Sequence, residues 1–486
     1  MKRWTKILVG AVAFLGVSTL LSGCGNKSES DGKTVVSMYM PGDKPKNYTQ
    51  LINKANSEIQ KKHPNIELSM KFIGWGDYEK KYNVMVTSGD NYDLAFAQNY
   101  VSNAQKGAYE DMTPLIKKYA QSAYNKVDPA YWKGVTVNNK IYGFPVNGNV
   151  YATNGITFNQ ALLDKYNIKP GDIKTYADME PALKEFHTKN KSVAAFAIGQ
   201  GFKASPASME FPLGNSLPFA IDSTGQSKKV FNAYDTDEMK SILNTLHHYY
   251  KEGYIPKDAA TSSTQYNLNE NTWFTRQETQ GPFDYGDTAL ENAAGGKKMI
   301  TYPITKPYKS EAQAQVAIWA ISKTSKHKKE AMQVLEMLNT NKTLLNNIVW
   351  GIQGKQWNFT NKAEGKIKTT SQYKPGTFVA GWMMGNNDLL YTQNTITQKQ
   401  IEERKQNIKN AKDSKGLGFT PNVTKYKTEV TNCSNVMSKY LDILNTGTAD
   451  PEPTIKKMDK ELKNAGYDTI QRALQKQYDA FLEKSK

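Results

Sequence analysis

Strand-like and helix-like segments alternate over residues 34–97, and this alternation constrains the fold more than any other feature of the chain. Residues 34–40 have an apolar strand pattern, and residues 66–72 alternate between apolar and polar side chains. Apolar side chains recur at helical spacing between these strands and again before residue 93. Residues 93–97 then supply a third, short strand. The order βαβαβ predicts a parallel sheet with helices on its faces, which is an α/β fold.

The first 23 residues have the pattern of a secretory signal peptide. Three basic residues precede an uncharged apolar run that ends at Leu21, and this run is shorter than the roughly 20 residues of a bilayer span. The Leu-Ser-Gly-Cys segment that ends at Cys24 resembles a bacterial lipobox, in which the cysteine is acylated and the chain is cut before it. We therefore expect residues 1–23 to be removed, Cys24 to carry a lipid, and the small polar residues 24–33 to form a tether. An ordinary signal peptide that ends near a cysteine is the alternative.

The rest of the chain mixes strands and helices, and its last part is mostly helical. Further strands are expected at residues 140–147, 149–158, 194–198, 299–302 and 316–322. Helices dominate from about residue 373, with a highly polar helix or loop at 398–415 and stops at Gly447 and Gly466.

Charge and cysteine content argue against a nucleic-acid-binding protein and against a disulfide-stabilised protein. The formal net charge is +17, but the lysines are scattered among acidic residues, which does not favour nucleic acid as a partner. A basic exported chain instead suits anionic wall polymers or lipid headgroups. Cys24 and Cys433 are the only cysteines, so no intrachain disulfide framework is expected, which fits a Gram-positive-type surface. Cys433 falls on an apolar helical stripe and is expected to pack in a core.

Five segments stand in a fixed order along the chain: residues 88–94, 142–146, 155–168, 252–255, and 317–322 with 327–338. Together they resemble the extracellular solute-binding proteins of ABC importers, of the family 1 type. Residues 349–357 resemble a loop of the large LplA-type lipoproteins, although Gln356 and Trp357 depart from the usual His and Tyr. The helical tail through residues 441–478 resembles the terminal domain of unknown function of the same lipoproteins.

The resemblance implies an α/β fold with two lobes, of the periplasmic-binding-protein-like type II class, with a hinge and a helical C-terminal extension. Lobe one would hold residues 34–147 and 308–365, and lobe two residues 148–307 and 366–486. It also implies a carbohydrate ligand, expected to be an oligosaccharide, in the cleft between lobes that close by hinge bending. The partner would be the transmembrane subunits of an ABC permease, and the protein would act as a monomer anchored outside the cell membrane.

A sugar site needs aromatic rings for stacking and amide or carboxylate groups for paired hydrogen bonds. In open α/β sheets ligands bind beyond the carboxyl ends of the strands. The candidate ligand-binding residues in such loops are Trp75, Asn99, Asn147, Trp273, Asp284, Tyr285, Trp350, Trp357 and Trp382. Trp75 lies between two glycines, which favours an exposed loop, and Asp284 is the carboxylate expected to bind sugar hydroxyls. A structural role in packing is the alternative for each of these side chains.

No motif indicates catalysis. The chain lacks His-Glu-x-x-His, Cys-x-x-Cys, Gly-x-Ser-x-Gly and a P-loop, and its five histidines show no metal-ligand spacing. We therefore expect a binding protein without cofactor or metal rather than an enzyme. Two alternatives stay open: the same fold with a peptide ligand, and a surface glycan hydrolase, which needs only two carboxylates.

Overall fold

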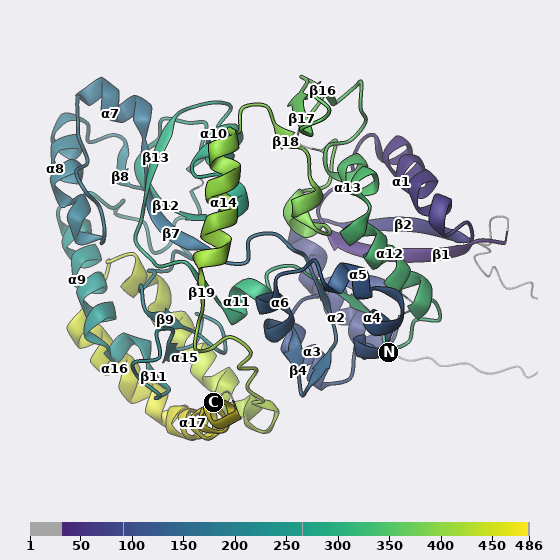
Figure 1. The fold of residues 1–486 in the computed structure, drawn as a ribbon. Helices are drawn as coiled ribbons and strands as arrows, with labels where there is room; N and C mark the ends of the chain where they lie inside the picture. Colours follow the sequence, from purple (N-terminus) through teal and green to yellow (C-terminus); the bar gives the residue numbers. More distant parts are fainter. Residues whose placement is uncertain (1–31, 91, 265, 375, 485–486) are drawn as a thin grey trace, which may run out of the picture.

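Two α/β lobes, each with its own hydrophobic core, make up the chain in this computed structural model, which describes residues 32–484 except 91, 265 and 375. The lobes lie side by side in Figure 1, with the N-terminal sheet in the right-hand lobe. The expected signal peptide, the expected lipidation site Cys24 and most of the tether fall outside the described residues. None of the described helices is both long and apolar enough to cross a bilayer.

Lobe one is built on a five-stranded sheet in the order β2-β1-β3-β15-β6. Its strands are β1 (Thr34–Pro41), β2 (Ile66–Ile73), β3 (Leu94–Phe96), β15 (Ile318–Ile321) and β6 (Phe144–Pro145). β1 pairs in parallel with β2 and β3, whereas β15 is antiparallel to β3 and β6. Because α1 (Tyr48–Lys62) and α2 (Trp75–Ser88) connect the first three strands, the predicted βαβαβ order is confirmed.

Short helices and a helical pair complete lobe one. They are α3 (Tyr100–Gln105), α4 (Thr113–Tyr119), α5 (Gln121–Tyr124), α6 (Pro129–Gly134), α12 (Lys328–Thr340) and α13 (Lys342–Val349). A hairpin of β4 (Thr136–Val137) and β5 (Lys140–Ile141) lies beside α3. Asp93 fixes the middle of the sheet, because its carboxylate accepts hydrogen bonds from Ser37 Oγ at 2.9 Å and from Ser325 Oγ at 2.7 Å. This buried carboxylate therefore joins β1, β3 and the loop after β15.

Lobe two contains a mostly antiparallel sheet in the order β13-β7-β12-β8. Its strands are β7 (Thr153–Asn159), β8 (Ala194–Phe196), β12 (Trp273–Gln280) and β13 (Met299–Pro303). Its helices are α7 (Gln160–Tyr166), α8 (Glu180–Lys189), α9 (Asp237–Lys251) and α10 (Thr288–Ala293). A small sheet of β9 (Met209–Glu210), β10 (Phe219–Asp222) and β11 (Phe231–Asn232) adjoins it. The strands expected from sequence at 149–158, 194–198 and 299–302 are thus present.

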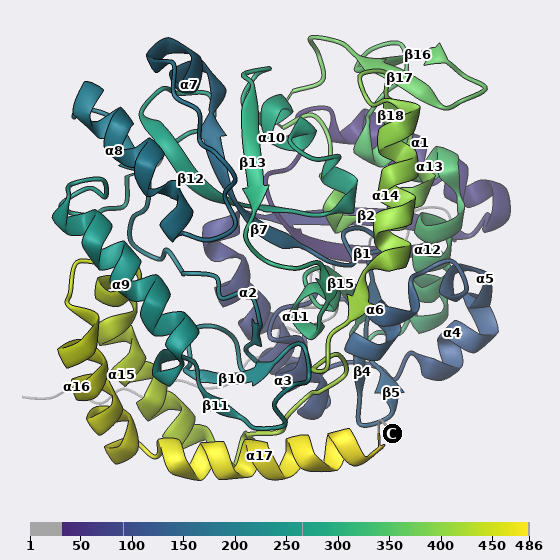
Figure 2. The same cartoon turned by 60° about the vertical axis from the view of Figure 1, so that its left-hand side comes forward.

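Three C-terminal helices pack on lobe two: α15 (Lys427–Asn445), α16 (Pro451–Asn464) and α17 (Tyr467–Lys484). Figure 2 shows α15 and α16 stacked beside α9, and α17 running along the lower edge of the molecule. Cys433 is fully buried in this helical core, as the apolar stripe predicted. Gly447, at φ 72°, lets the turn after α15 approach α9, since a Cβ there would lie 2.2 Å from the Leu246 carbonyl oxygen.

The chain passes between the two cores over residues 151–156, 304–314 and 417–419. We expected residues 366–486 in lobe two, but Val379, Met383 and Leu417 belong to the core of lobe one. One physical reason is the Trp319 indole N–H, which donates to the Met383 carbonyl oxygen at 2.8 Å and fixes that loop to β15. The last crossing into lobe two therefore lies near residue 418. The apolar contacts of the segment before it place that segment in lobe one.

Residues 373–393 differ most from the expected helices, whereas the polar segment at 398–415 is largely helical, one of its two expected states. Residues 357–393 form a small sheet of β16 (Trp357–Asn361), β17 (Lys366–Thr369) and β18 (Thr392–Gln393), with two 3₁₀ turns, η4 (Gly381–Met383) and η5 (Asn387–Leu389). The polar segment forms α14 (Gln398–Asn410), which begins with a capping box of Thr397 and Gln400. Next to it, β19 (Lys412–Asp413) pairs in parallel with β14 (Tyr308–Lys309), the strand before α11 (Glu311–Ala314).

Candidate functional site

Two exposed tryptophans stack at the carboxyl end of the lobe-one sheet. Trp75 opens α2 directly after β2 and is 57% exposed, and Trp382 of η4 is 45% exposed. Their ring centroids are 6.0 Å apart and their planes differ by 21°. Large apolar rings at this exposure leave a flat surface against which the CH face of a sugar can stack. We name the pair the tryptophan platform.

The tryptophan platform rests on the core of lobe one. The Trp382 ring meets Phe96, the last residue of β3, edge to face at 6.0 Å, and Phe96 meets Trp319 of β15 at 5.6 Å. On the other side, a Cβ added to Gly42, just after β1, would lie 3.8 Å from Trp75 Nε1. The platform therefore lies beyond the carboxyl ends of β1, β2 and β3, where open α/β sheets bind ligands.

Asn99 lies at the same edge of the sheet as Trp75. It follows β3, is exposed, and has a positive φ of 49°, a conformation that asparagine tolerates better than most residues. Its amide nitrogen donates to Glu79 Oε1 of α2 at 3.5 Å. The amide is therefore placed where it can bond a hydroxyl group above the strand ends.

Trp350 is half-buried and packs against the core of lobe one. Its ring is tilted against Tyr373 at 5.3 Å, and Tyr373 stacks on Phe378 at 4.2 Å. Burial raises the pKa of Tyr373. The indole Nε1 of Trp350 is buried and has no hydrogen-bond partner in the described part of the chain, so protein atoms cover this unsatisfied donor and only the exposed part of the ring is open to a ligand.

Trp273 and Trp357 are both buried, in contrast to the expectation that they line a site. Trp273 has no exposed surface, and its indole N–H donates to the Asn267 carbonyl oxygen at 2.9 Å. Trp357 is 2% exposed and donates to the Gly351 carbonyl oxygen at 3.0 Å. Packing and a satisfied donor account for each ring, so we leave both residues out of the proposed site.

Asn147 lies on lobe one, just before the first crossing between the lobes, and its buried amide joins two parts of the chain. The side-chain nitrogen donates to Asn386 Oδ1 at 2.8 Å and lies 3.4 Å from Asp388 Oδ2. The backbone of Asn147 also pairs with residues 385 and 387. Asn147, expected as a ligand-binding residue, thus uses its amide to hold residues 385–388 in place.

Asp284 and Tyr285 lie in lobe two, in and after the 3₁₀ turn η3 (Pro282–Asp284). Asp284 accepts hydrogen bonds from the Gly281 N–H at 2.5 Å and from Asn149 Nδ2 at 3.1 Å. Burial raises the pKa of the Asp284 carboxyl group, and these two donors oppose that rise. The carboxylate expected to bind sugar hydroxyls is therefore already bonded inside the protein, to its own turn and to Asn149 on the segment that leads from lobe one into lobe two.

Arg404 is the residue of this region that sequence reasoning missed. It lies on α14, is only 8% exposed, and donates to Tyr285 Oη at 3.1 Å and to Asp388 Oδ1 at 3.2 Å. Burial raises the pKa of Tyr285, and the Arg404 guanidinium partly opposes the rise. The spacing of Ile401, Arg404 and Ile408 marks the inner face of the helix, and this signal could have placed Arg404 there.

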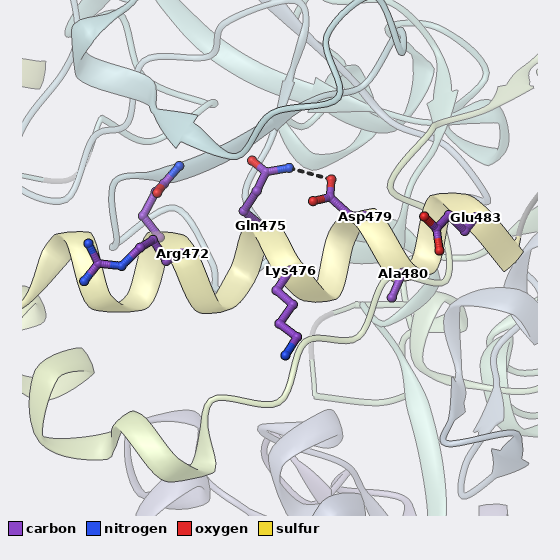
Figure 3. Close-up of a pocket in the computed structure, with 7 residues that line it drawn as sticks. Arg472, Gln475, Lys476, Asp479, Ala480 and Glu483 are labelled. Carbon is purple, nitrogen blue, oxygen red and sulfur yellow. Dashed lines mark hydrogen bonds between the residues drawn. The ribbon is translucent and has the colours of Figure 1, made fainter.

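Two other features do not form part of this site. The described residues contain no group of three or more His, Cys, Asp or Glu side chains that could hold a metal ion. A hollow of about 450 Å³ lies along α17, where Gln475 donates to Asp479 at 2.8 Å (Figure 3). Gln471 and Gln475 also donate to carbonyl oxygens of residues 230 and 228, so they attach α17 to lobe two.

Comparisons with known proteins identify the family of this chain. Residues 42–344 match the family described as bacterial extracellular solute-binding protein, and residues 415–483 match a domain of unknown function (DUF3502). The chain is 42% identical to a carbohydrate ABC transporter substrate-binding protein of Streptococcus pneumoniae, over 100% of both chains.

Solved structures of an N-glycan transport solute-binding protein (NgtS) from Streptococcus pneumoniae are similar to the whole fold. One has a TM-score of 0.90 at 43% identity, covering 93% of this chain and 100% of that chain. The complex of NgtS with Man5GlcNAc has a TM-score of 0.82, at the same identity and coverage. These matches confirm the predicted resemblance, its terminal domain and the two-lobed α/β fold. The chain belongs to the bacterial extracellular solute-binding protein family.

Proposed function

We propose that this protein captures an oligosaccharide between its two lobes and delivers it to an ABC permease. The observation that carries the proposal is the tryptophan platform, an exposed stacked pair at the sheet edge where this class of fold binds ligands. The 43% identity to NgtS, whose solved structures include complexes with Man5GlcNAc and Man1GlcNAc, supports a glycan that contains mannose and N-acetylglucosamine.

In this proposal Trp75 and Trp382 stack on the sugar, and Asn99 bonds its hydroxyl groups. Trp350 is a second point of contact, through the exposed part of its half-buried ring. Asp284 and Tyr285 act at the junction of the lobes, because their polar atoms are already bonded to Asn149 and Arg404.

The remaining parts of the proposal concern location and partners. The lipobox-like segment supports a lipid at Cys24 that anchors the protein outside the membrane, with residues 24–33 as a tether. A tethered receptor stays near its permease, which is the advantage of the anchor. We propose that it acts as a monomer and does not convert its ligand.

Calorimetric titration with Man5GlcNAc and with a library of short peptides tests the ligand class. We expect saturable binding of Man5GlcNAc with one site per chain, no binding of peptides, and no sugar product after prolonged incubation. Tight binding of peptides alone would exclude the sugar proposal. Release of mannose or N-acetylglucosamine by the purified protein would instead indicate a hydrolase.

A further inference from the structure

Polar contacts form a closed ring across the junction of the two lobes. From Asn147 the ring runs through Gly148 and Asn149 to Asp284 and Tyr285 of lobe two. It then passes through Arg404 to Asp388, and Asp388 Oδ2 returns to Asn147 Nδ2 at 3.4 Å. We name this ring of Asn147, Asn149, Asp284, Tyr285, Arg404 and Asp388 the hinge clasp.

Arg404 bridges the two lobes from α14, which is separate in sequence from the segment between β6 and β7. Its helix α14 contacts lobe one through Ile408, which packs against that core, and contacts η3 of lobe two. Figure 1 shows α14 standing between the lobes. One guanidinium nitrogen bonds Tyr285 and another bonds Asp388, so the two lobes are fixed to one rigid, planar group.

Aromatic packing adds to these bonds. The Arg404 guanidinium lies 4.3 Å from the centroid of the Phe283 ring and 5.7 Å from that of the Tyr285 ring. Gln400, one turn earlier on α14, donates to the Tyr285 carbonyl oxygen at 3.3 Å. Contacts of this kind are worth more when buried, and Arg404 is 8% exposed. These contacts all join α14 to η3 and Tyr285, so a hinge motion that separates Tyr285 from Asp388 has to break either the Arg404 bond to Asp388 or this whole set.

The second side of the hinge clasp restricts the segment between β6 and β7 that leads from lobe one to lobe two. Asn149 Oδ1 accepts a hydrogen bond from the Phe283 N–H at 2.8 Å, and the Asn149 carbonyl accepts one from Gln313 Nε2 at 2.7 Å. Gly281 is packed so closely that a Cβ there would lie 2.3 Å from Asn149 Cγ. The first crossing is therefore held by lobe two and by α11 at once.

We propose that the hinge clasp holds the lobes in the arrangement seen here until ligand binds, with Arg404 as its positioning residue. The TM-score of this arrangement is 0.90 to one NgtS structure, 0.84 to the Man1GlcNAc complex and 0.82 to the Man5GlcNAc complex. Without the clasp, the lobes close in the absence of ligand. Because a more populated binding-competent state raises the apparent affinity, loss of the clasp should tighten ligand binding. This consequence rests on the proposed function, whereas the geometry of the clasp does not.

Distance measurements between two spin labels test the proposal. The labels are placed by Lys54→Cys on α1 and Lys184→Cys on α8, both exposed positions on different lobes, in the full chain with Cys24→Ser. Cys433 is buried, so it does not react in the folded protein. We expect one main distance without ligand, which shortens on addition of Man5GlcNAc.

Arg404→Met should add a shorter-distance population in the absence of ligand and tighten the apparent affinity for Man5GlcNAc about threefold. Lys405→Met, the neighbouring exposed cation on α14, is the matched control and should keep the parent distance. Tyr285→Phe removes only the hydroxyl that Arg404 bonds, and it decides the test if Arg404→Met does not fold.

An unchanged distance distribution in the folded variants of both Arg404 and Tyr285 would overturn the proposal. The ligand-free measurement does not depend on the identity of the ligand. A shorter distance in these variants without any binding of Man5GlcNAc would therefore support the hinge clasp and count against the proposed function alone.

Discussion

The two lobes of this solute-binding protein differ in the tryptophans that they expose. In lobe one, Trp75 and Trp382 expose 57% and 45% of their surface. In lobe two, Trp273 exposes none, and Phe274 stacks on Phe186 with ring centroids 4.0 Å apart. The difference teaches that an aromatic residue indicates a ligand site only when the fold leaves its face uncovered. Lobe one presents a prepared apolar surface, whereas the rings of lobe two stabilise its own core.

Phe274→Ala tests the structural half of this comparison and should have the largest effect. Removing a fully buried ring that stacks on Phe186 leaves a cavity and should lower the free energy of unfolding by about 3–5 kcal/mol. Urea denaturation of the variant and the parent measures the difference. Calorimetry on the folded variant should show nearly unchanged affinity for Man5GlcNAc. A loss of stability below about 1 kcal/mol would contradict the structural role.

Trp75→Ala tests the ligand-binding role of the exposed rings in lobe one. Unlike Phe274→Ala, it should weaken ligand affinity and leave stability nearly unchanged. We expect about tenfold weaker binding of Man5GlcNAc, or roughly 1.4 kcal/mol, because the variant loses one ring of the platform. The free energy of unfolding should change by less than about 0.5 kcal/mol, since the ring is mostly exposed. Val84→Ala, also on the surface of α2 with 56% exposure, is the matched control. Equal affinities of the two variants would remove Trp75 from the site.

The two lobes also differ in the hydrogen bonding of their buried carboxylates, and this difference predicts how stability depends on pH. Asp93 of lobe one accepts hydrogen bonds from two serines, whereas Glu210 Oε1 on β9 has no partner among the described residues. Burial raises the pKa of Glu210 to about 7 from an ordinary value of 4.5. The folded state therefore binds the proton more tightly than the unfolded chain, and stability should fall as pH rises from about 4.5 to about 7.

Glu210→Gln should remove that part of the pH dependence. Urea denaturation at pH 5 and pH 7.5 should show a loss of stability on the order of 1 kcal/mol or more in the parent and a smaller loss in the variant. Glu311, whose pKa is also raised by burial, contributes with the same sign and remains in both. Glu364→Gln, at an exposed position, is the control. An identical pH slope in parent and Glu210→Gln would show that Glu210 is not responsible.

Removal of a helix cap, a feature that both lobes have, should give the smallest effect. Asn341 caps α13 in lobe one by accepting from the Leu344 N–H at 2.9 Å, and Thr236 caps α9 in lobe two by accepting from the Met239 N–H at 3.2 Å. Asn341→Ala and Thr236→Ala should each cost about 1 kcal/mol of unfolding free energy. Because capping is local, neither change should alter ligand affinity, and a large effect of one cap on binding would contradict that view.

Local patterns predicted the fold where neighbours in sequence are also neighbours in space. The alternation over residues 34–97 placed β1, α1, β2, α2 and β3, and the apolar stripe placed Cys433 in a core. The glycines around Trp75 indicated its exposure correctly. Periodicity and turn chemistry act over a few residues, so one sequence is enough to find them.

The sequence by itself determined the α/β class, the resemblance to solute-binding proteins and the candidate lipobox. Only the tertiary structure decided which tryptophans face solvent, because Trp75 and Trp382 come together from positions 307 residues apart. It also decided that Arg404, on a helix that is polar on most sides, is buried between the lobes. The physical reason is that the exposure of a side chain depends on which distant segments cover it, and no local pattern records that.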